Sequence, residues 1–92
     1  LKYLILMIQN PWFVYILECQ DDSLYTGISN NVEKRMEAHK KGTGSKYVKW
    51  KRFKQLLHTI QVKDKSEAAK LEYKIKKMER NEKISFFVNY RK

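Results

Sequence analysis

Five side chains in this 92-residue chain are of the types that could act together on a phosphate ester. Tyr15 and Tyr25 stand ten positions apart, on segments whose patterns predict two successive strands. Arg35 and His39 are four residues apart and share one face of a predicted helix. Glu72 falls on the apolar side of a second predicted helix. Phosphodiester hydrolysis needs a hydroxyl near the attacking water, a cation for the phosphate and a hard oxygen ligand for a divalent metal, and this set supplies all three.

Each of these residues also has a purely structural interpretation. Tyrosine is common in strands, so either tyrosine alone could be a core aromatic. Arg35 could lie on a solvated helix, with Glu33 and Glu37 as counter-charges, and a lone histidine such as His39 is more often structural. His58 is isolated in a predicted strand and is given no role.

The position of Glu72 is the most unusual of the five. It follows Ala68 by four residues and precedes Ile75 by three, so a helix places it on the side that carries apolar residues. A carboxylate there costs several kcal/mol unless it is paired, hydrogen-bonded or bound to a metal. The alternative is a boundary residue that pairs with Lys76 at i+4.

The elements that must position these residues follow from local patterns. Residues 12–19 and 24–29 predict two strands joined by an acidic turn, and therefore a β-hairpin. Gly27 inside the second strand suggests a close approach of the backbone to a neighbour. Residues 55–62 predict a third strand, with Leu56, His58, Ile60 and Val62 on one side.

Three helices are predicted around these strands. Asn30 or Asn31 caps a helix over 32–40, which ends near the glycines of 42–44. Asp64 and Glu67 have the spacing of a capping box, although Ser66 competes for the cap, and the helix runs from Ser66 to about Arg80. A short last helix begins near Asn81, with an apolar side formed by Ile84, Phe87 and Val88.

The segment 45–54 is predicted to be a basic, aromatic loop. Its candidate contacts to nucleic acid are Lys46, Tyr47, Lys49, Lys51 and Arg52, and Tyr47, Trp50 and Phe53 could stack on bases. The alternative is a solvated turn with Trp50 and Phe53 packed beneath it. The net charge of +10 on so short a chain favours a polyanionic partner, although membrane-surface and ribosomal domains share such a charge.

The composition predicts one compact domain over 11–90, preceded by an N-terminal extension over 1–10. The apolar run at the start is too short to cross a membrane. The single cysteine, Cys19, excludes an intramolecular disulfide and is interpreted as a small core residue, which fits the cytoplasm. One cysteine and two histidines cannot form a zinc finger.

The order of these motifs resembles the GIY-YIG nuclease superfamily, and in particular its small stand-alone bacterial proteins. The first signature stands here as Phe13-Val14-Tyr15 and the second as Tyr25-Thr26-Gly27. The shared features then continue through Arg35 with His39, the stretch Gly42-Thr43-Gly44-Ser45-Lys46-Tyr47, and Glu72-Tyr73-Lys74-Ile75-Lys76. The first signature lacks its glycine, which Phe13 replaces.

The resemblance implies an α+β fold with a three-stranded antiparallel sheet flanked by helices. It implies that Tyr15, Tyr25, Arg35, His39 and Glu72 are catalytic. Tyr25 or His39 would position or deprotonate the attacking water, Arg35 would hold the phosphate, and Glu72 would ligate Mg²⁺ or Mn²⁺. The appended DNA-binding domain of many relatives is missing from residues 1–92.

Three functions remain open from the sequence. The first is a metal-dependent endonuclease acting on DNA. The second is a nucleic-acid-binding module that keeps the fold without turnover. The third, a small adaptor of protein interactions, rests on size alone. A protein partner that delivers this small domain to its substrate is compatible with each nucleic-acid hypothesis.

Overall fold

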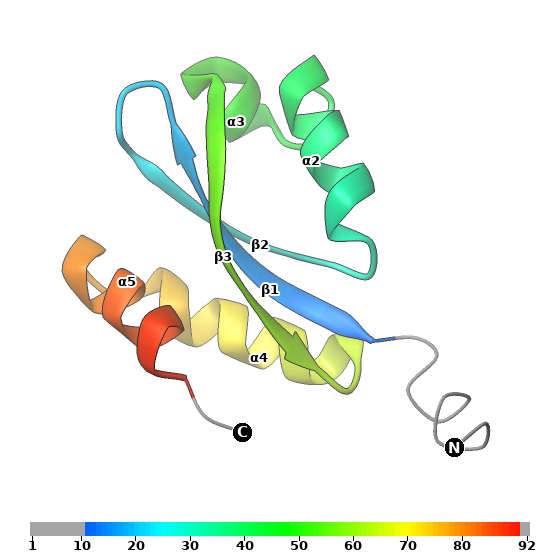
Figure 1. Ribbon diagram of the computed structural model, residues 1–92, viewed down its shortest axis with the longest axis vertical. Helices are drawn as coiled ribbons and strands as arrows, with labels where there is room; N and C mark the ends of the chain where they lie inside the picture. Colours follow the sequence, from blue (N-terminus) through cyan, green and yellow to red (C-terminus); the bar gives the residue numbers. More distant parts are fainter. Residues whose placement is uncertain (1–10, 91–92) are drawn as a thin grey trace.

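The computed structural model describes residues 11–90, which form a three-stranded sheet with two helices on each face (Figure 1). The predicted extension over 1–10 lies outside the described residues. The elements are β1 (Trp12–Cys19), β2 (Leu24–Ser29), α2 (Val32–Lys41), α3 (Lys46–Lys51), β3 (Phe53–Val62), α4 (Lys65–Lys76) and α5 (Arg80–Asn89). The sheet order is β2-β1-β3 and both pairings are antiparallel. The predicted α+β architecture is confirmed.

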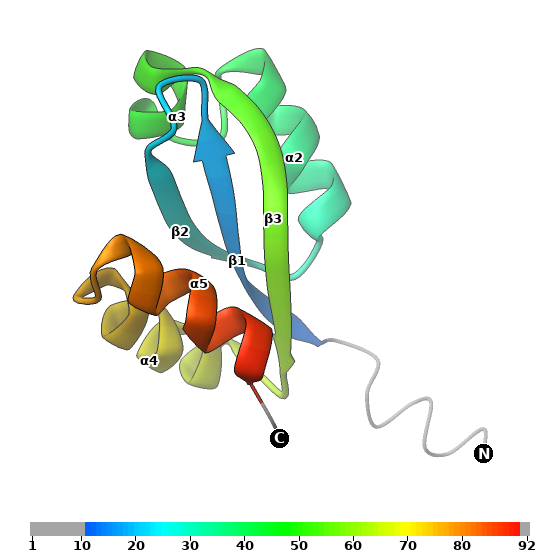
Figure 2. The same cartoon turned by 60° about the vertical axis from the view of Figure 1, so that its left-hand side comes forward.

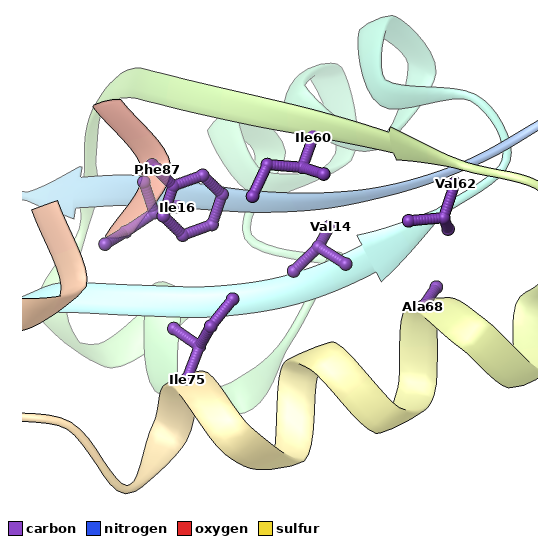
Figure 3. Close-up of a cluster of buried hydrophobic side chains, with 7 residues drawn as sticks. All are labelled: Val14, Ile16, Ile60, Val62, Ala68, Ile75 and Phe87. Carbon is purple, nitrogen blue, oxygen red and sulfur yellow. The ribbon is translucent and has the colours of Figure 1, made fainter. Parts of the chain in front are cut away.

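Alternation along β1 divides the core into two clusters, one on each face of the sheet. Tyr15, Leu17 and Cys19 pack with Met36 of α2 and Val48 of α3. Between them, Val14 and Ile16 face the other way, into a cluster completed by β3, α4 and α5, whose members are Ile60, Val62, Ala68, Ile75 and Phe87 (Figure 3). Figure 2 shows α4 and α5 on one side of the sheet and α2 and α3 on the other.

The central strand explains why the fold can hold a site. Val14 to Leu17 are fully buried, because helices cover both faces and strands flank both edges of β1. A side chain on the α2 face of β1 is therefore fixed by its neighbours on every side. Tyr15 occupies that position.

The strand β3 departs from the predicted alternation. Its pairing with β1 shifts between Ile16 and Leu17, so that Leu17 pairs with Leu56 whereas Ile16 pairs with His58. Leu57 is the extra residue of this β-bulge and packs against the α4 and α5 cluster. Leu56 is thus turned to the other face, and the prediction that it shares a side with His58, Ile60 and Val62 is wrong.

Both ends of α2 and the start of α4 lie close to their predicted positions. The side chain of Asn31 accepts a hydrogen bond from the backbone N–H of Lys34 at the start of α2. Gly42 ends that helix in a left-handed conformation, with φ of 82°. Asp64 caps α4 by accepting from the N–H of Glu67. These caps fix where α2 and α4 begin, and so which residues face the sheet.

Two local predictions need correction. The predicted loop over 45–54 contains α3, because Ser45 caps its first turn by accepting from the N–H of Val48, and Val48 is fully buried. The predicted long helix after Ser66 ends at Lys76, and Glu79 with Glu82 forms a capping box that begins α5. Val88 is 56% exposed, and Phe86 packs against the core in its place.

Cys19 is fully buried in the cluster under α2 and α3, as predicted. Among residues 11–90, no helix combines the length and apolar character needed to cross a membrane.

Candidate active site

The site is built around a buried hydrogen bond between Tyr15 and His39. The Tyr15 hydroxyl oxygen lies 2.8 Å from Nε2 of His39. Tyr15 is fully buried and His39 is 2% exposed. The central strand and α2 therefore hold a phenol and an imidazole together, away from solvent.

Two glycines leave the space for this pair. Gly27 lies opposite Tyr15 in the β1–β2 pairing, and a Cβ there would stand 2.5 Å from the Tyr15 hydroxyl oxygen. A Cβ on Gly44 would stand 2.5 Å from Nδ1 of His39. The close approach predicted at Gly27 is confirmed. The role of Gly44 was missed, because contact with a ring on another element leaves no local signal in the sequence.

Further aromatic rings surround the pair. The ring of Tyr25 lies 6.4 Å from that of Tyr15 and 5.6 Å from that of His39, measured between centroids. Tyr47 stacks on Tyr25 at 5.9 Å, and Phe53 lies parallel to the His39 ring at 6.5 Å. Tyr47 and Phe53, predicted as candidates for stacking on bases, thus pack on the site itself.

Burial keeps both members of the central pair uncharged. It raises the pKa of the Tyr15 hydroxyl above its ordinary value, and the neighbouring Tyr25 adds to the rise. Burial, with the positive charge of Arg35, lowers the pKa of His39 to about 4. At neutral pH the pair is therefore a phenol beside a neutral imidazole.

Arg35 and Glu72 bring opposite charges to the same hydroxyl. The positive charge of Arg35 lowers the pKa of Tyr15, and the negative charge of Glu72 raises it, both against the larger effect of burial. Arg35 is half-buried and borders a small pocket of about 270 Å³ with Asn31 and Lys34. Arg35 and Lys34 therefore give this pocket, near the start of α2, a positive charge.

Glu72 lies on α4, which covers the other face of the sheet, and its charge acts on Tyr15 from there. Its side chain is 23% exposed, and Oε2 lies 3.2 Å from Nζ of Lys76. Glu72 is thus half-buried and pairs with Lys76, which is the boundary position that the alternative interpretation predicted. Lys76 is 52% exposed and on the surface of its helix, so this ion pair is weak.

The available carboxylate ligand fits an ion such as Mg²⁺ that is bound through few protein groups. Residues 11–90 contain no group of three or more histidine, cysteine, aspartate or glutamate side chains able to hold a metal ion. Mg²⁺ is commonly held by one or two carboxylates, with waters and substrate phosphates completing its shell. The single carboxylate of Glu72 suits that mode.

The predicted basic contacts lie on and beside α3. Lys46, Lys49 and Arg52 are exposed. Lys51 differs from them, because its Nζ lies 2.8 Å from Oδ2 of Asp21. Lys49 and Arg52 line a pocket of about 540 Å³ whose wall also includes His39. Cationic side chains thus extend from the site along α3.

Comparison with known proteins decides the family. Residues 11–85 match the model of the GIY-YIG catalytic domain. The chain belongs to the GIY-YIG family. That match spans the tyrosines, the arginine and the glutamate described above, in the order that the sequence analysis relied on.

The most similar relatives of this GIY-YIG protein include UPF0213 proteins of two bacteria. The one from Clostridium perfringens is 47% identical over 72 residues, which are 78% of this chain and 77% of that protein. The one from Staphylococcus aureus strain Mu50 is 46% identical over 72 residues, which are 78% and 88% of the two chains. These names state no reaction or substrate.

A solved structure gives the same fold. The solution NMR structure of a UPF0213 protein from Bacillus halodurans is 37% identical and covers 83% of this chain and 81% of its own, with a TM-score of 0.50. The predicted family and fold are thus confirmed.

Proposed function

We propose that this GIY-YIG protein is a metal-dependent endonuclease that hydrolyses phosphodiester bonds in DNA. One observation carries the proposal: a single hydroxyl, that of Tyr15, is bonded to His39 and lies within the electrostatic reach of Tyr25, Arg35 and Glu72. These residues come from four elements on both faces of the sheet. Packing alone does not require that the charges of a guanidinium and a carboxylate both act on one buried tyrosine hydroxyl.

Burial divides the roles among these residues. Tyr15 and His39 are buried, whereas Tyr25 is half-buried and lies beside both. Tyr25 is therefore the tyrosine that contacts the attacking water, and its hydroxyl orients the water by accepting a hydrogen bond from it. Tyr15 and His39 act as positioning residues that hold the Tyr25 ring by packing against it.

The charged residues act on the phosphate. Arg35 binds a non-bridging oxygen of the scissile phosphate, because a guanidinium fork matches phosphate geometry. Glu72 would hold the Mg²⁺ or Mn²⁺ ion, which when bound supplies Lewis-acid stabilisation of the developing charge. The weak pairing of Glu72 with Lys76 leaves the carboxylate available for this purpose.

The alternative function is a nucleic-acid-binding module without turnover. The Lys76 pairing is the observation that favours it, because Glu72 then has a structural partner and needs no metal. The net charge of +10 does not distinguish the two functions, because both require binding to a polyanion.

The two functions are separated by a cleavage assay on labelled single-stranded, duplex and branched DNA and on RNA, with Mg²⁺, with Mn²⁺ or with a chelator. The endonuclease proposal predicts metal-dependent cleavage of DNA by the wild type and its loss in Glu72→Ala, with binding retained. Binding without cleavage of any substrate would assign the protein to the alternative.

A further inference from the structure

The short helix α3 presents a tryptophan that the proposed chemistry does not use. Trp50 is 74% exposed, whereas Val48 is fully buried. Two residues along a helix turn by about 200°, so the burial of Val48 directs Trp50 outward. Scattered exposed apolar residues are ordinary on proteins, so exposure alone would carry no inference.

The surroundings of Trp50 set it apart. Nζ of Lys51 lies 4.4 Å from the centre of the indole ring, and the same atom pairs with Asp21 at 2.8 Å. Asp21 is itself held in the β1–β2 turn, where it accepts hydrogen bonds from the N–H and hydroxyl of Ser23. The turn therefore fixes Lys51 over one face of the indole, and the ring is left to present its other face to solvent.

The position of Trp50 connects it with the proposed site. Trp50 lies three residues after Tyr47, so the two are neighbours on the helix surface. Tyr47 in turn stacks on Tyr25 at 5.9 Å. Three exposed cations flank Trp50 in the sequence: Lys46, Lys49 and Arg52. Lys49 and Arg52 line a pocket together with Lys40 and Lys41 of α2.

We propose that the open face of Trp50 is a stacking platform for an unpaired base, and that the cations of α2 and α3 hold the phosphates on either side of it. This inference rests on the proposed function and narrows its substrate to nucleic acid with single-stranded or unstacked nucleotides. In a duplex each base face is covered by its neighbours, so a single exposed indole has no base face to contact. Base–aromatic stacking next to a positively charged groove is the usual mode of single-strand binding.

Tryptophan emission tests this directly, because Trp12 and Trp50 are the two tryptophans of the chain. The protein is titrated in a chelator, to prevent cleavage, with an oligothymidine single strand and with a duplex of the same length. The proposal predicts that the single strand quenches the tryptophan fluorescence of the wild type, whereas the duplex has little effect on it. Trp50→Phe, which keeps only Trp12, should show no quenching by the single strand. Trp50→Ala should weaken single-strand binding roughly ten-fold.

A matched control is available on the other side of the molecule. Tyr73 of α4 is 67% exposed and has Nζ of Lys77 at 4.1 Å over its ring, and α4 lies far from α3 in Figures 1 and 2. Tyr73→Ala should leave single-strand affinity unchanged.

The outcomes separate this inference from the proposed function. Single-strand binding without a change in Trp50 emission, and with equal affinity in Trp50→Ala, overturns the stacking platform and leaves the nuclease proposal standing. Equal quenching by duplex and single strand also overturns it. Failure of every nucleic acid to bind, even at low salt, overturns both.

Discussion

The hydroxyl of Tyr15 and Nε2 of His39 lie 2.8 Å apart, although the residues are 24 positions apart in the sequence. Tyr15 is fully buried and His39 nearly so, and two glycines, Gly27 and Gly44, leave the space that the rings fill. Because burial disfavours charge on both groups, the pair stays neutral and serves as a fixed support for the half-buried Tyr25.

The hydroxyl of Tyr15 should be needed for stability as well as for turnover. Tyr15→Phe leaves the buried Nε2 of His39 without its partner, which costs roughly 1–3 kcal/mol of unfolding free energy. Within residues 11–90 the Tyr25 hydroxyl makes no hydrogen bond, so Tyr25→Phe should change stability by less than about 0.5 kcal/mol. Urea unfolding measures both. Equal destabilisation by the two variants would contradict the division of roles between the tyrosines.

The two glycines should tolerate no added methyl group. Gly27→Ala places a Cβ 2.5 Å from the Tyr15 hydroxyl oxygen, and Gly44→Ala places one 2.5 Å from Nδ1 of His39. Both rings are buried and cannot move aside freely, so each variant should lose about 1–3 kcal/mol of stability. Thermal unfolding checks this, with exposed Thr43→Ala as the control. Glycine variants as stable as that control would show that the rings can shift.

His39 should make stability depend on pH in a defined window. Its pKa of about 4 in the folded protein lies below the ordinary 6.5, so the unfolded chain takes up a proton first as the pH falls. The contribution of neutral His39 is therefore complete above about pH 6.5 and is lost as the pH falls toward 4. His39→Gln keeps a hydrogen-bonding side chain and removes the titration.

Melting temperatures of wild type and His39→Gln, measured from pH 7.5 to pH 4.5, give the comparison. The wild type should lose more stability than the variant across this range. Parallel curves would mean that His39 titrates at its ordinary pKa in the folded protein.

Local rules predicted several elements correctly, although the Ser45 cap and the capping box of Glu79 and Glu82 were missed. The strand patterns predicted the hairpin that carries Tyr15 and Tyr25, and the caps at Asn31 and Asp64 set the helices that carry Arg35 and Glu72. Each of these signals operates within a few residues of the chain.

Other features that the sequence did not predict depend on contacts between distant elements. The bulge at Leu57 is set by its pairing with β1, and Gly44 is required by a ring on α2. The exposure of Trp50 follows from α3, a helix of one and a half turns that is fixed by the Ser45 cap and the burial of Val48. The segment 45–54 is too short to show the periodicity that would predict a helix there.

The most direct test of metal-dependent hydrolysis at this site compares variants of the two residues in the Glu72–Lys76 ion pair. Glu72→Gln and Lys76→Gln both break the contact between Oε2 and Nζ, which is partly exposed, so each should change stability by less than about 1 kcal/mol. Only Glu72→Gln removes the carboxylate that would hold the metal.

The measurement is the rate of DNA cleavage with Mn²⁺ or Mg²⁺ by these two variants and the wild type. If Glu72 holds the metal, Lys76→Gln should cleave within a few-fold of the wild type, whereas the rate of Glu72→Gln should fall by at least about a hundred-fold while DNA binding is retained. Equal rates in the two variants, or cleavage that survives in Glu72→Gln, would contradict the assignment of this site to metal-dependent hydrolysis.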